Sequence, residues 1–261
     1  MRTLLSCCTL YFCLCSCYAQ PSPKNKEIKC DAKIEREYTD GPASIAFIHL
    51  HANETTALNA VRQFLERNKG SLFYVKQREA RNVSLVIHDS IFQFDPNRMF
   101  TRAGRKANLN PYSVTADSAV KMFASEIVSQ LHSYRIVISL HNNTSSNFSI
   151  SSYKKGGEFE SEASRVYMNR KMDEDDFVFT TDENIFNKCR KQKLNVVLQD
   201  NVRRTDDGSL SVYCANVKLS YVNIEAEFGH ADQQLKMLEF IYQVVSAGSE
   251  ERSYAAEKSG E

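Results

Sequence analysis

Residues 44–68 have the sequence SIAFIHLHANETTALNAVRQFLERN. Residues 44–50 are a short apolar run of the kind that forms a buried strand, and residues 55–68 carry apolar side chains on one helical stripe. His51 and Glu54 lie between the predicted strand and the predicted helix. The imidazole at the strand end and the carboxylate at the first helical turn are therefore expected to lie close together. The stretch predicts a strand–loop–helix unit with two candidate metal ligands at its turn.

Predicted strands and helices continue to alternate along the chain. Further strands are predicted at residues 72–75, 83–87, 135–140, 195–199, 210–214 and 221–228, and further helices at residues 116–132 and 231–245. The strands at 195–199 and 210–214 flank Asp207 and Gly208, which predicts a hairpin. Strands that alternate with helices predict one α/β domain with a mixed, largely parallel sheet flanked by helices.

The composition is that of a globular protein, with 42% hydrophobic and 25% charged residues. This excludes a disordered polyampholyte and a collagen-like or low-complexity chain. The 33 basic and 32 acidic side chains nearly cancel. No basic field is therefore available to attract nucleic acid or anionic lipid, and neither is an expected partner.

The first residues carry the features of a targeting segment. Arg2 precedes an apolar run over residues 4–15, and small residues lead up to Gln20. We predict a signal peptide over residues 1–19 and a secreted or periplasmic protein. A retained membrane anchor is disfavoured, because the run is shorter than the ~20 apolar residues that span a bilayer. The alternative is a lipid anchor on Cys17, since residues 14–17 resemble a bacterial lipobox.

The predicted organisation continues with an N-terminal arm at residues 20–43, a catalytic domain at 44–248 and a polar tail at 249–261. No transmembrane helix is expected in the mature chain. The cysteines left after cleavage are Cys30, Cys189 and Cys214. Three thiols in an oxidising compartment allow one disulfide, and we predict it between Cys189 and Cys214.

A third candidate ligand, His141, follows the apolar strand at residues 135–140. Two histidines and one glutamate are the ligand set of a catalytic zinc that keeps one position open. Metal ligands in such a sheet belong at the carboxyl ends of strands, where His51 and His141 both lie. His49 faces the same side as His51 and competes as a ligand. Its alternative role is that of a buried, hydrogen-bonded strand histidine.

Two further features supply groups for substrate chemistry. Asn97 and Arg98 lie side by side after a strand, and a guanidinium binds a carboxylate through two hydrogen bonds. Glu225 and Glu227 share a face near the end of the strand at 221–228. One of these carboxylates can serve as a general base towards a zinc-bound water.

Four segments, in this order, resemble the aspartoacylase and succinylglutamate desuccinylase family, within the wider group of zinc carboxypeptidases. They are HANE at residues 51–54, DPNRMF at 95–100, HNNTSSN at 141–147 and EFG at 227–229. The family carries His-Gly-Asn-Glu, Asp-Leu-Asn-Arg, a His followed by Asn, Thr or Ser, and Glu-x-Gly. Four short motifs in the same order are far more specific than any one of them.

The resemblance implies a zinc carboxypeptidase-like fold with one Zn²⁺ per chain. Carried over by position, it implies that the zinc ligands are His51, Glu54 and His141. It implies further that Asn97 and Arg98 bind a substrate carboxylate and that Glu227 is the catalytic base. Glu227 also lies nearer than Glu225 to the carboxyl end of its strand, where the ligands are delivered.

The chain departs from the family at several positions. Ala52 replaces a Gly, Pro96 replaces a Leu, and Ser139 stands where an Asp commonly precedes the third ligand. The family also has an extra Arg, shortly before its Asn-Arg pair, that polarises the scissile carbonyl. Residues 89–90 occupy that region here, so Arg81 is the substitute candidate for this catalytic role.

These features predict a secreted zinc-dependent hydrolase that cleaves an amide bond next to a free carboxylate, in the manner of a carboxypeptidase. Its partner would be a peptide or acyl-amino acid. One alternative is an N-acyl-amino-acid deacylase of the aspartoacylase type. The other is a non-catalytic protein that binds zinc or carboxylates. The missing polarising Arg favours the last, and Glu227 argues against it.

Overall fold

The computed structural model of the chain describes residues 28–38, 44–144 and 148–258, and only the backbone of residues 248–258. The predicted signal peptide and the alternative lipid site at Cys17 lie outside these residues. Within the described ranges, none of the helices is long and apolar enough to cross a membrane.

The core of the fold is an eight-stranded sheet with the order β2-β4-β3-β7-β11-β9-β10-β8. The strands are β2 (Lys33–Tyr38), β3 (Ile45–His49), β4 (Ser71–Lys76), β7 (Ile136–Asn143), β8 (Ala163–Tyr167), β9 (Phe177–Thr180), β10 (Val196–Gln199) and β11 (Ser220–Glu227). The central strands β4, β3, β7 and β11 are mutually parallel, and β2, β8 and the β9–β11 pair add antiparallel contacts. The predicted mixed, largely parallel sheet is confirmed.

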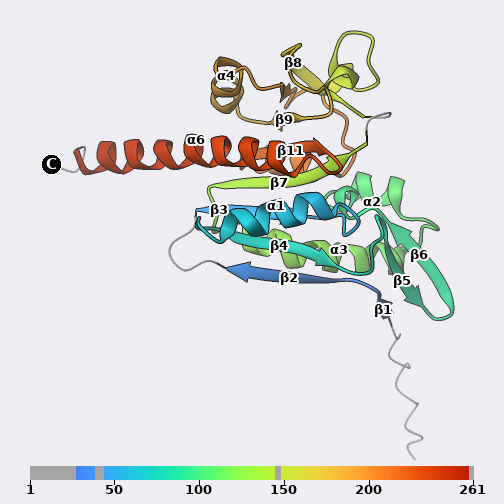
Figure 1. Ribbon diagram of the computed structural model, residues 1–261. Coiled ribbons are helices and arrows are strands. Elements are labelled where there is room, and N and C mark those ends of the chain that lie inside the picture. The colour runs from blue at the N-terminus through green and yellow to red at the C-terminus, as the bar shows by residue number, and fades with distance from the viewer. Residues whose placement is uncertain (1–27, 39–43, 145–147, 259–261) are drawn as a thin grey trace, which may run out of the picture.

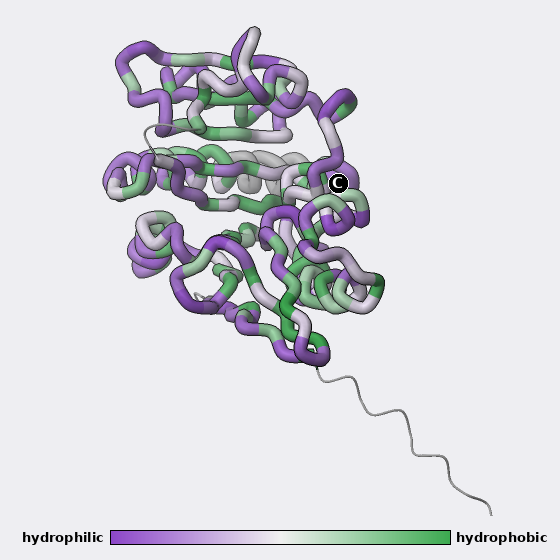
Figure 2. Tube along the Cα trace, turned by 90° about the vertical axis from the view of Figure 1, so that its right-hand side faces the viewer, coloured by the Kyte–Doolittle hydropathy of each residue, from purple (hydrophilic) through white to green (hydrophobic). Residues whose placement is uncertain are grey.

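Helices cover both faces of this sheet (Figure 1). One face carries α1 (Thr55–Leu65), α4 (Glu183–Lys191) and α6 (Ala231–Lys258), and the other carries α2 (Arg102–Asn108), α3 (Val114–Leu131) and α5 (Leu210–Asn216). Alternate strand residues point to opposite faces, so Phe47 packs with α1 while Ile48 belongs to the other core. Figure 2 shows the apolar residues concentrated along the inner strands and the polar ones along the outer loops.

A small second sheet and three short 3₁₀ helices complete the domain. The sheet has the order β1-β5-β6 and consists of β1 (Ile28–Cys30), β5 (Val83–Ile87) and β6 (Ser90–Phe94). The 3₁₀ helices are η1 (Pro96–Arg98), η2 (Ile150–Tyr153) and η3 (Glu160–Glu162). The β5–β6 hairpin leads directly into η1, which carries Asn97 and Arg98, so it positions the predicted substrate-binding pair.

The predicted arm at residues 20–43 contains two strands, so the fold begins before residue 44. β2 pairs antiparallel with β4 along its whole length, from Lys33 opposite Lys76 to Tyr38 opposite Ser71. Its sequence, KIEREY, is charged because it forms an edge of the sheet, and charged residues are usual on such strands. At the other end of the chain, α6 continues to Lys258, through most of the predicted tail.

The predicted hairpin around Asp207 and Gly208 is wrong, because its second strand is the helix α5. The Ser209 hydroxyl caps this helix by accepting a hydrogen bond from the Val212 amide. Gly208 has a φ of +82°, and a Cβ there would collide with the carbonyl oxygen of Arg98. The glycine therefore lets the segment before α5 pack directly against η1.

The predicted disulfide between Cys189 and Cys214 is also wrong. Cys189 lies on α4 and Cys214 on α5, and both are buried free thiols. They belong to the two different cores, so the sheet lies between them. Cys30 is a free and exposed thiol on β1.

Candidate metal centre

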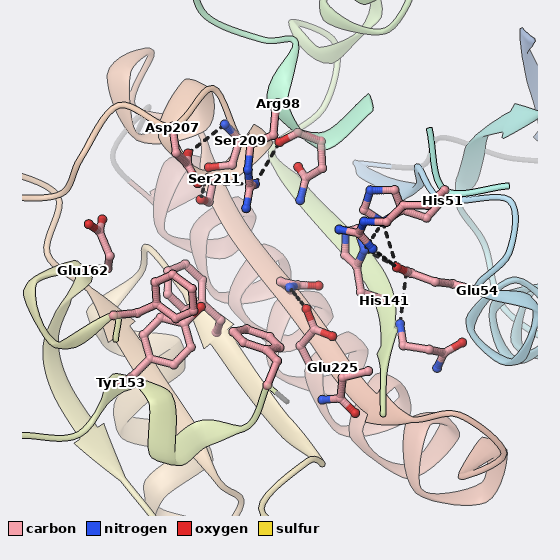
Figure 3. Close-up of a pocket in the computed structure, with 18 of the residues that line it drawn as sticks. His51, Glu54, Arg98, His141, Tyr153, Glu162, Asp207, Ser209, Ser211 and Glu225 are labelled. Atoms are coloured by element: carbon pink, nitrogen blue, oxygen red, sulfur yellow. Dashed lines mark hydrogen bonds and ion pairs between the residues drawn. The ribbon is translucent and has the colours of Figure 1, made fainter. Parts of the chain in front are cut away.

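Three of the predicted site residues meet at the carboxyl edge of the central parallel strands (Figure 3). His51 follows β3, His141 lies near the end of β7, and Glu54 is the residue before α1. Parallel neighbours end at the same edge of a sheet, which is why residues far apart in sequence converge here. The residues are almost fully buried, with exposed fractions of 1% for His51, 4% for Glu54 and 3% for His141.

The ligand atoms of this group face one another at short distances. Nδ1 of His51 lies 2.8 Å from one carboxylate oxygen of Glu54, and Nδ1 of His141 lies 2.9 Å from the other. The two Nδ1 atoms are 3.1 Å apart. One atom from each residue can therefore contact a single ion, and the group can hold a metal.

The hydrogen bonding of His51 provides a test of whether these residues fit a cation. Its Nε2 lies 2.7 Å from Oδ1 of Asp95, and a carboxylate only accepts, so Nε2 is the donor. A neutral His51 then directs the lone pair of Nδ1 at the Glu54 carboxylate and at His141. Such lone pairs repel unless a positive charge lies among them. Two imidazole nitrogens and a carboxylate suit Zn²⁺.

The pKa shifts follow from the same arrangement. Burial opposes a charge on His51, but the carboxylates of Glu54 and Asp95 outweigh it and raise its pKa to about 9. Burial alone would raise the pKa of Glu54, and the imidazoles of His141 and His51 hold it well below its usual range. A proton and a metal ion therefore compete for the same centre of negative charge.

Asp95 lies against His51, a contact that sequence reasoning missed. It is the first residue of the DPNRMF segment, and its Oδ1 also accepts a hydrogen bond from the Asn97 amide at 2.7 Å. Burial tends to raise its pKa, but the hydrogen bond and charge of His51 hold it well below the usual range. A carboxylate that fixes the ring and tautomer of a ligating histidine is typical of metal sites.

Asp95 therefore predicts a variant with weakened metal affinity. Asp95→Asn keeps the size of the side chain but removes the charge behind His51, and zinc affinity should fall ~10- to 100-fold. Competition with a chelator measures this. Asp117→Asn is the control, because it removes a partly buried carboxylate that pairs with Arg105 away from the site. Equal affinities in Asp95→Asn and the wild type would contradict the role of Asp95.

Arg81 lies at the edge of the metal group. Its guanidinium forms ion pairs with Glu54 at 3.0 Å and with Asp95 at 3.2 Å, and half of the side chain is exposed. The structure thus places the predicted substitute arginine beside this group, where it contacts the carboxylates of Glu54 and Asp95.

His49 has the alternative role stated for it, that of a buried strand histidine. It is fully buried, and its Nε2 donates a hydrogen bond to the backbone carbonyl of Glu54 at 2.9 Å. Burial lowers its pKa to about 4. Its ring thus supports the backbone at the start of α1, at Glu54.

A cavity of about 570 Å³ opens beside the metal group. The residues of the sequence-predicted site that line it are His51, Glu54, Arg81, Asn97, Arg98 and His141. Arg98 contacts Asp207 at 3.3 Å, and its Nη1 donates to the carbonyl of Asn97 at 3.0 Å. The Asn97 side-chain oxygen accepts from the Leu210 amide at 3.2 Å, which ties this pair to the start of α5.

The structure separates the two candidate bases on β11. Glu225 lines the cavity, is 6% exposed, and lies opposite His141 in the strand register. Burial raises its pKa, and Asn223 donates a hydrogen bond to it at 2.8 Å. Glu227 is not among the residues that line the cavity.

Glu227 instead belongs to a second group at the surface. It lies within ligand distance of Asp173 and His230, and the Nε2 of His230 is 3.5 Å from its carboxylate. Its backbone amide donates to Asp176 in the segment before β9. Asp176 also contacts His230, so the segment before β9 contributes to this surface group.

Comparisons with known proteins find solved structures that are similar at low sequence identity. No protein-family model matches the chain, and no curated protein sequence matches it significantly. A solved gene product of Agrobacterium tumefaciens is 14% identical, with a TM-score of 0.46 over 82% of this chain and 94% of that one. A "putative metallopeptidase" from Shewanella amazonensis SB2B is 10% identical, with a TM-score of 0.40 over 81% and 79%. Another from Shewanella baltica OS155 is 10% identical, with a TM-score of 0.41 over 81% of each chain.

Proposed function

We propose that the chain is a secreted zinc-dependent hydrolase that cleaves an amide bond next to a free carboxylate. One observation carries this proposal: the cavity brings together the His51–Glu54–His141 group, the buried carboxylate of Glu225 and the guanidinium of Arg98. Secretion rests on the sequence of residues 1–19. The four family-like segments support the same chemistry, since each of them supplies at least one residue of this cavity.

The protein groups have separate tasks in this proposal. Bound zinc would polarise a carbonyl and lower the pKa of a water molecule towards ~7. Glu225 takes the role first predicted for Glu227: it accepts the proton of the attacking water and passes it to the leaving amine. Burial raises the pKa of Glu225. A base whose pKa lies closer to the working pH transfers protons more effectively in both directions.

Arg98 positions the substrate through its carboxylate. In the free protein the guanidinium is paired with Asp207, so a substrate carboxylate would take the place of Asp207. Arg81 is already engaged by two carboxylates. These contacts favour a role in holding Glu54 and Asp95, in place of the predicted polarisation of the scissile carbonyl.

The role of Arg98 predicts a selective loss. A charge-assisted contact contributes about 1.5 to 3 kcal/mol, so Arg98→Ala should lower kcat/KM for free-acid substrates by ~10- to 150-fold. Zinc content and the slow turnover of amidated substrates should not change. Arg102→Ala, at an exposed position on α2, is the control. If the wild type cleaved free-acid and amidated substrates equally well, Arg98 would not be recognising a substrate carboxylate.

A substrate panel tests the proposal and separates it from its alternatives. The zinc-loaded chain is incubated with peptides and N-acyl-amino acids, each as free acid and as amide. Cleavage of C-terminal residues from peptides supports the carboxypeptidase-like activity, and release of short acyl groups alone supports the deacylase alternative. If the zinc-loaded chain binds free carboxylates but hydrolyses none of the panel, the non-catalytic alternative replaces the proposal.

A further inference from the structure

One wall of the cavity is built from aromatic rings. Phe148, Tyr153, Phe159 and Phe179 line it, and we call these four residues the aromatic wall. The ring centroids of Tyr153 lie 5.8 Å from Phe148, 5.6 Å from Phe159 and 5.4 Å from Phe179. Phe148 and Phe159 are 5.8 Å apart, so the rings form one continuous surface.

The wall faces the polar groups across the cavity. Figure 3 shows Tyr153 on the side opposite His51 and His141, with Arg98 and Asp207 on a third side. No charged group belongs to the wall. Burial raises the pKa of the Tyr153 phenol, so it is neutral at physiological pH. The cavity thus has a side with the candidate metal ligands, a side that carries the Arg98–Asp207 ion pair and an apolar side.

We propose that the aromatic wall binds a flat apolar side chain, such as a benzyl group, on the residue that carries the substrate's free carboxylate. This inference rests on the proposed function. An α-amino acid unit carries its amide nitrogen, its carboxylate and its side chain on one carbon. The three sides of the cavity match these groups: the metal group takes the scissile amide, Arg98 the carboxylate and the wall the side chain.

An aromatic side chain of the substrate suits the aromatic wall better than a methyl group or a carboxylate does. Aromatic rings attract one another in offset and edge-to-face arrangements beyond the burial of apolar area. A methyl side chain would leave the wall uncovered in a cavity of about 570 Å³. An aspartate side chain would place a charge against rings that offer no counterion, which is costly. Glu162 at the edge of the wall already accepts hydrogen bonds from the Thr205 amide, so its carboxylate is partly satisfied.

Turnover of a matched substrate series tests this inference. The substrates share one acyl group and a free carboxylate and differ only in the last side chain: Phe, Leu, Ala, Asp or Lys. We expect kcat/KM for Phe to exceed that for Ala by ~10- to 200-fold, with Asp the poorest. If any of Ala, Asp or Lys is cleaved as well as Phe, the inference is wrong while the proposed hydrolase function stands.

A binding measurement keeps the inference testable if no substrate is cleaved. Calorimetry on the metal-free full-length protein compares N-acetylphenylalanine with N-acetylalanine. Tighter binding of the phenylalanine compound supports the wall as an aromatic subsite even where the hydrolase proposal fails. Equal binding, or binding of neither, overturns the inference.

Variants of Phe159 test whether the aromatic wall causes the preference for a Phe side chain in the substrate. Phe159 is partly exposed and lines the cavity, so Phe159→Ala should lower the Phe-to-Ala ratio of kcat/KM at least fivefold, mainly through the KM of the Phe substrate. Phe159→Leu keeps most of the volume and guards against a folding defect. Phe240→Ala removes a partly buried ring on α6 and should leave the ratio unchanged. An unchanged ratio in both Phe159 variants would overturn the assignment.

Discussion

His141→Ala is expected to lose stoichiometric zinc and all hydrolysis together. The Nδ1 of His141 lies 3.1 Å from that of His51 and 2.9 Å from the Glu54 carboxylate, so its removal leaves only two of the three donors. Two donors do not make a structural or catalytic zinc site. Metal analysis of the purified variant measures the loss, and turnover is followed in parallel.

The control for His141→Ala is His132→Ala, which changes an exposed histidine after α3. It should keep both zinc and activity. His51→Ala should behave like His141→Ala, whereas His49→Ala should retain metal, because His49 bonds the backbone of Glu54 and not the metal group. A His141→Ala protein that is folded and still holds one zinc per chain would show that the buried group is not the site.

Glu225→Gln is expected to lower kcat by ~10² to 10⁴ while zinc and substrate binding are retained. Glutamine keeps the size of the side chain and can still accept the hydrogen bond from Asn223. It cannot accept a proton from the attacking water. Steady-state kinetics gives kcat, and calorimetry with a substrate analogue shows that binding survives.

Glu227→Gln is the matched control, since it makes the same change two residues along the same strand. Glu227 lies outside the cavity next to His230, so this variant should keep nearly all of its kcat. The opposite outcome, with loss in Glu227→Gln and normal turnover in Glu225→Gln, would mean that β11 presents a different residue to the substrate.

Burial explains which parts of the fold the sequence predicts. β3 and β7 are buried on both faces, so they appear as continuous apolar runs, and the histidines after and within them stand out. β2 is a charged edge strand, and its sequence resembles an arm. The run at residues 210–214 is short and apolar, and periodicity alone does not separate a buried helical turn from a strand at that length.

The candidate site residues also differ in whether the sequence predicts them. His51, Glu54 and His141 are predictable because parallel strands end at one edge. The choice between Glu225 and Glu227 is not, because alternation places both on one face, and only the folded structure shows that Glu225 lines the cavity while Glu227 lies beside His230. Asp95 escaped prediction because its contact with His51 joins two separate loops.

The aromatic wall also could not be predicted from the sequence. Its rings come from a polar stretch after β7 and from β9, and only the folded chain turns them towards the same cavity. The same holds for the thiols of Cys189 and Cys214, which a count of cysteines pairs but which the sheet keeps apart. Contacts between distant segments are set by packing, which local patterns do not encode.

Anomalous diffraction at the zinc edge, on crystals of the zinc-loaded chain, would locate the metal ion itself. We expect one strong peak per chain within bonding distance of Nδ1 of His51, Nδ1 of His141 and the Glu54 carboxylate. No peak there, or a single peak at the Asp173–Glu227–His230 group instead, would contradict this expectation.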